Sequence, residues 1–141
     1  MLTLFIVLIA ISVQGTQPSG GSATIKLAGP DIKVSGTYPT TLCGGPYMLS
    51  KGMAYRVKAG DYQITIASQT RASGAVPLNT ATGIVNVTVT VNGKGKHFVR
   101  GPKNSGKLTV SADYRKAEAA LELRPVVGGG TVTLLATFNC K

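Results

Sequence analysis

The sequence is poor in acidic residues, histidine and aromatic side chains. Its 141 residues include five Asp and Glu, one His, two Cys and no Trp. The five carboxylates show no paired motif for acid–base catalysis, and a nucleophile would have to use the single histidine as its base. A His/Cys cluster at metal-ligand spacing and a phosphate-binding glycine loop that opens a helix are also lacking. We therefore expect no catalysis, no metal and no cofactor.

The scarcity of aromatic residues also argues against a nucleic-acid partner. Proteins that bind single strands combine a basic groove with aromatic side chains on which the bases stack. Aromatic residues make up 6% of this chain, and in its most basic segment only Phe98 lies among the cations. Nucleic acid is therefore an unlikely partner.

The longest apolar run, residues 1–13, is too short to span a membrane, which takes about 20 residues. Its length is typical of the core of a signal peptide, with Val13 and Gly15 at the −3 and −1 positions of a cleavage site before Thr16. The predicted order is a signal peptide (1–15), a flexible leader (16–22) and one domain (23–141). We expect a secreted or cell-envelope protein, extracellular or periplasmic, with no transmembrane anchor after cleavage.

The two cysteines, Cys43 and Cys140, match no metal spacing and form an even pair in a chain that we expect to be exported. A disulfide between them would close a loop of about 100 residues, which stabilises a domain by about 4–5 kcal/mol in the chain-entropy model. Free buried thiols and a catalytic cysteine are the alternatives. We predict the disulfide.

Alternation of apolar and polar side chains with a period of two continues through most of the predicted domain and indicates β-strands. It is clearest in IVNVTVTV, residues 84–91. The composition of residues 115–124, RKAEAALELR, favours a helix. A helix would place Leu121 and Leu123 about 200° apart, whereas a strand keeps both on one face, so we predict a strand.

Turn-forming residues separate these segments. We predict connections at residues 37–47, TYPTTLCGGPY, and at residues 69–83, the longest stretch without a pattern. The predicted strands are 23–28, 31–36, 53–58, 61–68, 84–91, 107–114, 115–124 and 131–138, with a further strand after the Asn92–Gly93 turn. This pattern predicts an all-β fold, an antiparallel β-sandwich (immunoglobulin-like or related) of about eight to nine short strands.

Basic residues outnumber acidic ones by fifteen to five, and five of the fifteen lie in residues 92–107, NGKGKHFVRGPKNSGK. A net charge of +10 favours anionic partners such as surface polymers, glycans or lipid head groups. The predicted contact residues for such a partner are Lys94, Lys96, His97, Arg100, Lys103 and Lys107. The alternative is that Lys and Gly near a sheet edge only discourage pairing with other chains.

The pairing of this segment depends on the turn at Asn92–Gly93, a dipeptide typical of a two-residue hairpin turn. A two-residue turn places Val91 opposite Lys94 and Val89 opposite Lys96. The same register continues with Val87 opposite Phe98 and Val85 opposite Arg100. A three-residue turn with a bulge would shift the register by one residue.

Three segments give the chain a resemblance to a known family. They are IKVSGTYPTTLC, with Cys43 after an early strand, LTVSADYRKAEAAL, and TVTLLATFNC, with Cys140 near the end. In these features the chain resembles small exported bacterial β-sandwich proteins, among them the mycobacterial lipoprotein-antigen family. The resemblance implies a disulfide-bridged sandwich in or outside the cell envelope, without catalysis. The chain departs from this family in lacking a Cys directly after the apolar run, so we expect no lipid anchor.

Together these features predict an exported, non-enzymatic surface or extracellular protein with a binding or structural role. In the first hypothesis, the basic hairpin segment binds anionic polymers or glycans. In the alternative, the chain is a protomer of a cell-envelope or fibre assembly, held by strand edges and apolar contacts. Charge-driven binding weakens as salt rises, which distinguishes the two.

Overall fold

The computed structural model describes residues 20–47, 52–76, 85–91, 94–96, 98–100, 106–125 and 130–141. These residues form strands, turns and coil, and no helix occurs among them, so none of them belongs to a helix that could cross a membrane. The strands are β1 (Ser22–Gly29), β2 (Ile32–Tyr47), β3 (Gly52–Ala59), β4 (Tyr62–Ser68), β5 (Gly74–Ala75), β6 (Val85–Val91), β7 (Lys94–Lys96), β8 (Phe98–Arg100), β9 (Gly106–Val110), β10 (Lys116–Pro125) and β11 (Val132–Asn139). The predicted signal peptide, residues 1–15, and most of the leader lie outside the described residues.

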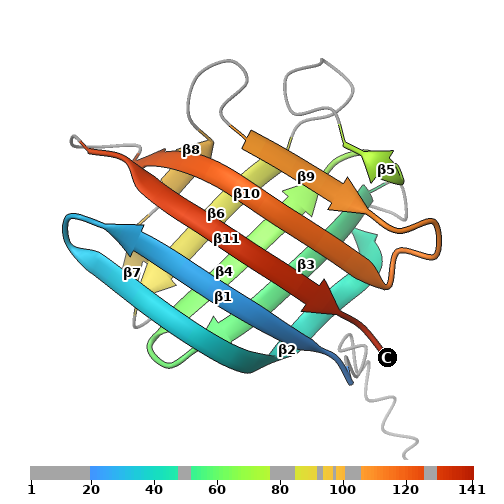
Figure 1. Ribbon diagram of the computed structural model, residues 1–141, viewed down its shortest axis with the longest axis horizontal. Helices are drawn as coiled ribbons and strands as arrows, with labels where there is room; N and C mark the ends of the chain where they lie inside the picture. The colour runs from blue at the N-terminus through green and yellow to red at the C-terminus, as the bar shows by residue number, and fades with distance from the viewer. Residues whose placement is uncertain are drawn as a thin grey trace, which may run out of the picture.

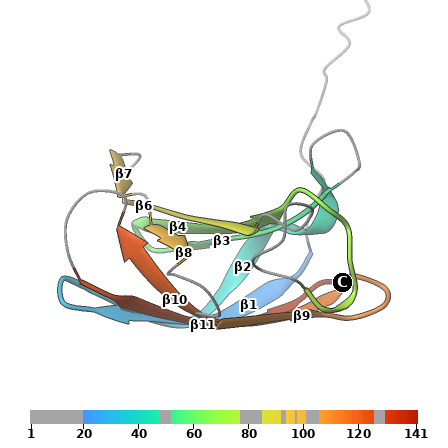
Figure 2. The same ribbon diagram turned by 90° about the horizontal axis from the view of Figure 1, so that it is seen from above.

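All pairings in the sheet are antiparallel (Figure 1). The strand order is β5-β9-β10-β11-β1-β2-β3-β4-β6-β7, and β8 pairs with β10 off this path. Figure 2 shows that the sheet curls, so that β1, β11 and β9 lie opposite β3, β4 and β6. The described residues therefore confirm the predicted all-β antiparallel fold. They form one continuous curled sheet rather than two separate ones.

Strand β2 joins the two halves of the sheet. Its first part pairs with β1 and its second part, from Thr40 onward, pairs with β3. The register shifts between Thr40 and Leu42 and again between Cys43 and Gly45. Such irregularities bend a strand and increase its twist, which lets β2 pass from one half to the other. The predicted connection at residues 37–47 is therefore wrong, because its Gly and Pro residues belong to a bent strand.

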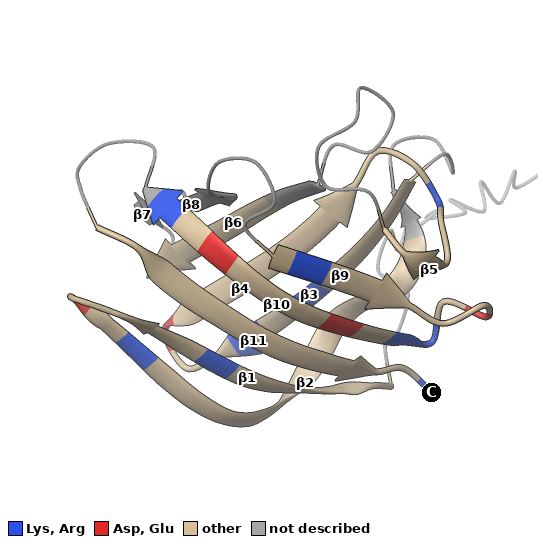
Figure 3. Ribbon diagram, turned by 45° about the horizontal axis from the view of Figure 1, so that its top comes forward, with Lys and Arg blue, Asp and Glu red and all other residues tan. Residues whose placement is uncertain are grey.

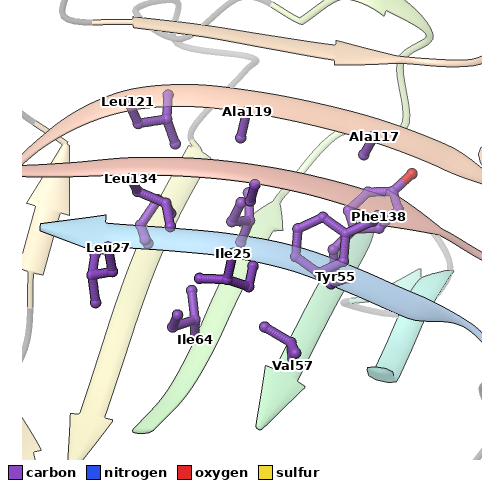
Figure 4. Close-up of a cluster of buried hydrophobic side chains, with 14 of the residues drawn as sticks. Ile25, Leu27, Tyr55, Val57, Ile64, Ala117, Ala119, Leu121, Leu134 and Phe138 are labelled. Carbon is purple, nitrogen blue, oxygen red and sulfur yellow. The ribbon is translucent and has the colours of Figure 1, made fainter. Parts of the chain in front are cut away.

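The core lies between the two halves. Every second residue of β1, β10 and β11 is buried, as the period of two predicts. From one half, Ile25, Leu134 and Phe138 point inward toward Tyr55 and Ile64 of the other (Figure 4). The rings of Tyr55 and Phe138 are 5.3 Å apart and tilted by 50°. A single hydrophobic core therefore packs between the two halves of the curled sheet.

Residues 116–125 are a strand, which confirms that periodicity outweighs helical composition here. In β10, Leu121 and Leu123 are both buried, whereas Glu118 and Glu122 are exposed. The strand predicted for 107–114 is too long, because β9 ends at Val110 and a turn follows.

The connection predicted for residues 69–83 is described only as far as residue 76. Within it, Gly74 and Ala75 form β5, which pairs with Val110 and Thr109 of β9. Val76 adds a backbone hydrogen bond from its N–H to the Leu108 carbonyl at 2.8 Å. This part of the predicted loop therefore covers one end of the sheet.

Candidate binding surface

The basic segment divides between the two halves of the sheet. Strand β7 pairs with β6 in the register of a two-residue turn, with Lys94 opposite Val91 and Lys96 opposite Val89. Strand β8 then pairs with β10, with Phe98 opposite Pro125 and Arg100 opposite Leu123. Of the two registers left open by the sequence, β7 has that of the two-residue turn, and this register does not continue along β6 into β8. Strand β8 pairs with the part of the β10 edge that β9 does not reach.

The predicted contact residues are separated by this arrangement. Lys94 and Lys96 belong to the end strand β7, whereas Arg100 ends β8. Lys107 is exposed on β9, which pairs with the same edge of β10 as β8 does. The structure therefore brings Arg100 and Lys107 to one edge, opposite Leu123 and Ala120 of β10. Two further predicted residues, His97 and Lys103, lie outside the described residues.

Lys107 also borders a hollow of about 650 Å³ on the outer face of β9, β10, β11, β1 and β2. One cross-strand row in this hollow, here called the lysine row, consists of Lys107, Ala120, Leu135, Lys26 and Ser35. Leu135 is 44% exposed, and no other large hydrophobic side chain of the described residues is so open. The row therefore places an apolar floor between two lysines, whose Cα atoms are about 14 Å apart across three strand spacings.

A second row, here called the hydroxyl row, runs parallel to the lysine row and is two residues away from it on each strand. It consists of Thr109, Glu118, Thr137, Thr24 and Thr37. The hydroxyls of Thr24 and Thr37 are hydrogen-bonded at 3.0 Å. Each hydroxyl has one donor and two acceptor positions, so this pair keeps hydrogen-bonding capacity for a ligand.

The outer face of this half carries separate charges rather than ion pairs. Figure 3 shows Lys and Arg on β1, β2 and β9, and both signs of charge on β10. In the part of the chain that the structure describes, no lysine forms an ion pair with a carboxylate. Lys26 and Lys107 are both exposed, so their charges are available to an anion.

The disulfide lies in another region, where β2 and the end of β11 meet the turn between β9 and β10. It joins Cys43 and Cys140, as predicted, across a Cα separation of 5.5 Å. Next to it, the backbone carbonyl of Tyr114 accepts a hydrogen bond from the Tyr55 hydroxyl at 2.9 Å. The guanidinium of Arg71 lies 4.3 Å from the centre of the Tyr114 ring. A disulfide is compatible with an extracellular or periplasmic location.

Tyr114 has a φ of +61°, the one positive value for a residue other than glycine in the described ranges. Strained backbone of this kind is frequent at functional sites but also occurs where packing requires it. Here packing accounts for it, because the conformation directs the Tyr114 carbonyl toward Tyr55 and Gly44.

The Asp113 carboxylate accepts hydrogen bonds from the Ser111 hydroxyl at 2.6 Å and the Arg115 N–H at 3.1 Å. These hydrogen bonds, with that of Ser111 the stronger influence, lower the pKa of Asp113.

Tyr55 gives this region a specific pH dependence. Burial raises its pKa to about 12, and the charge of Arg71 opposes this rise only in part. Below pH 10 the hydroxyl is protonated in both the folded and the unfolded chain, so stability is unaffected. Between about pH 10 and pH 12 only the unfolded chain loses this proton, so stability falls as pH rises.

We expect the Tyr55→Phe variant to lose about 1 kcal/mol at pH 7, because the Tyr114 carbonyl loses a buried hydrogen-bond donor. From about pH 10 to pH 12 the wild type should lose about 2 kcal/mol more than this variant. Urea unfolding carried out at pH 7, pH 10 and pH 12 measures both values. Tyr38→Phe, which removes an exposed hydroxyl, is the control and should keep the wild-type slope. Parallel pH profiles for the wild type and Tyr55→Phe would contradict the assignment.

Sequence reasoning missed the hollow, because alternation shows which side chains face outward but not which strands are neighbours.

In the described ranges, no group of three or more His, Cys, Asp and Glu side chains lies close enough to hold a metal ion. No family model, curated protein or solved structure matches the chain. The resemblance to exported bacterial sandwich proteins therefore stays a prediction.

Proposed function

We propose that this protein is an exported, non-enzymatic surface or extracellular binding protein whose ligand is an anionic polymer or glycan. Its curled sheet would act as an immunoglobulin-like sandwich domain, and its basic hairpin segment would contact the ligand through Lys94, Lys96, His97, Arg100, Lys103 and Lys107. The supporting observation is a net charge of +10 combined with exposed lysines that form no ion pair with carboxylates in the described residues. Lipid head groups are the other anionic partners that this charge would suit.

The arrangement of the basic segment supports a contact role in one respect. Its two short strands leave the edge of β6 and reach the edge of β10, where Arg100 and Lys107 approach the same strand. Lys107 is exposed at this edge, so its charge is available to an anionic ligand.

The alternative, a protomer of an envelope or fibre assembly, would need free strand edges. The strands at the two ends of the sheet, β5 and β7, have two and three residues. Strands as short as these give little backbone for pairing with a second chain. Residues 32–39 of β2 pair only with β1 among the described residues, so the longest free edge that an assembly could use lies there. An apparent molar mass, measured by light scattering, that rises with protein concentration would favour the assembly. The measurement is made at a salt concentration that abolishes polymer binding.

The proposal is tested with dextran sulfate as the anionic polymer. We expect the wild type to bind it, and the affinity to fall by about tenfold or more when NaCl rises from about 50 to about 300 mM. Binding of the protein's cations releases counterions from the polymer, and this release is less favourable at high salt. Isothermal titration calorimetry at several salt concentrations measures this dependence. Absence of binding at the lowest salt concentration would refute the proposal.

The role of the hairpin is tested by the triple variant Lys94→Ser, Lys96→Ser and Arg100→Ser. Its matched control is Lys33→Ser, Lys58→Ser and Lys141→Ser, which removes the same number of charges from exposed positions elsewhere. We expect the hairpin variant to bind dextran sulfate at least about fivefold more weakly than the control. Equal affinities would show that only the net charge matters and not this segment.

A further inference from the structure

The hollow on the outer face, which shares only Lys107 with the hairpin proposal, combines three kinds of side chain. The lysine row supplies two cations, the floor between them is apolar, and the hydroxyl row supplies threonine hydroxyls and one carboxylate. We propose that this hollow is a binding site for an acidic polysaccharide that lies across the strands. The inference rests on the proposed function and names its ligand class and its location on the sheet.

The two lysines determine how the polymer would lie. Lys107 and Lys26 belong to the same cross-strand row, separated by β10 and β11. A chain that follows this row crosses the strands nearly at right angles and meets a cation at each end of the hollow. With both side chains upright, the two ammonium groups lie about as far apart as the two Cα atoms, about 14 Å, so a ligand that meets both in this position must be extended. The spacing therefore favours an extended ligand with repeated negative charges.

The floor and the hydroxyl row distinguish a sugar polymer from other polyanions. Ala120 is small and Leu135 is 44% exposed, so the floor can contact the apolar face of a sugar ring. The Thr24 and Thr37 hydroxyls and the Glu118 carboxylate can exchange hydrogen bonds with sugar hydroxyls, because an ionised carboxylate accepts from O–H donors. A polyanion without hydroxyl groups would leave these hydrogen-bonding groups without donors or acceptors from the ligand.

Two other anionic ligands suit the hollow less well. A membrane surface would require apolar side chains that insert among the lipids, and Leu135 is the one large hydrophobic residue that is well exposed in the described part of the chain. A single-stranded nucleic acid would require aromatic platforms, and no aromatic residue lines the hollow. Anionic vesicles nevertheless serve as a comparison in the test.

The test uses polygalacturonate as the acidic polysaccharide. We expect the double variant Lys26→Ser, Lys107→Ser to bind it about tenfold more weakly than the control Lys58→Ser, Lys141→Ser, which loses the same charge outside the hollow. Neutral dextran and phosphatidylglycerol vesicles should bind weakly and should not distinguish the two variants. If the vesicles bind more tightly than polygalacturonate and the Lys26/Lys107 variant loses that binding, the site is a lipid site and the proposal is overturned.

A second pair of variants tests position rather than charge loss. Ala120→Glu adds a carboxylate on the floor, and Thr133→Glu adds one at an exposed position of β11 outside the hollow. Both side chains face solvent, so we expect both variants to fold, which unfolding curves check. Ala120→Glu should weaken polygalacturonate binding by at least about fivefold relative to Thr133→Glu.

The outcomes separate the two proposals. If the wild type binds polygalacturonate and both variant pairs show equal affinities, the hollow is not the site, and binding through the hairpin still stands. If the wild type binds neither polygalacturonate nor dextran sulfate at low salt, both proposals fail.

Discussion

Replacing both cysteines, as in Cys43→Ser with Cys140→Ser, should lower the free energy of unfolding by about 4–5 kcal/mol. The bridge spans 97 residues, and closing so long a loop removes much conformational freedom from the unfolded chain. Domains of this size are stable by about 5–15 kcal/mol in total, so the loss is a large part of their stability. The melting temperature should fall by on the order of 15 °C.

Urea unfolding of the oxidised wild type and of the double variant measures the difference. The wild type treated with a phosphine reductant is the matched control, because it breaks the same bond without changing the sequence. Both should show the same decrease in stability. A decrease below about 1 kcal/mol in both would mean that the unfolded chain is already compact around this loop.

The strands that border the core could be predicted from the sequence because burial imposes a period of two on them. In β10 this period outweighed a composition typical of helices, since Ala117, Leu121 and Leu123 all face the core. The cysteine pair could be predicted because few alternatives exist for two cysteines in a chain that is expected to be exported. These features depend on local pattern and residue type.

Features that depend on which strands become neighbours could not be predicted. Residues 37–47 resemble a loop in sequence, yet two register shifts make them a strand that serves both halves of the sheet. Strand β8 pairs with β10 at Leu123, which β9 does not reach. This pairing depends on tertiary structure and not on the local sequence. The hollow follows from the same cause, since Lys107 and Lys26 are far apart in sequence and share a row only through β10 and β11.

Gly44→Ala should lower the free energy of unfolding by about 3–4 kcal/mol, more than Gly60→Ala or Gly45→Ala. Gly44 has a φ of +68°, which costs an L-residue about 1–2 kcal/mol. A Cβ at this position would also overlap the backbone carbonyl oxygen of Tyr114, which cannot move without breaking its hydrogen bond from Tyr55. Overpacking of this kind costs about 1–3 kcal/mol more.

Two other glycines serve as controls for the two contributions. Gly60 has a φ of +60° with open space around its missing side chain, so Gly60→Ala should cost only about 1–2 kcal/mol. Gly45 has open space and no positive φ, so Gly45→Ala should change stability by less than about 1 kcal/mol in either direction. Denaturant unfolding of the three variants measures each contribution. Equal losses for Gly44→Ala and Gly60→Ala would show that Tyr114 yields without cost.

The link between Gly44 and Tyr55 can then be measured directly by a double-mutant cycle. If the added methyl group displaces the Tyr114 carbonyl, the hydrogen bond from Tyr55 is already broken in Gly44→Ala. Tyr55→Phe should then cost about 1 kcal/mol in the wild type and close to nothing in the Gly44→Ala background. If the losses of Gly44→Ala and Tyr55→Phe are additive, the strain of Gly44→Ala does not act on the Tyr114 carbonyl. That carbonyl would then not be the contact that couples β2 to the turn before β10.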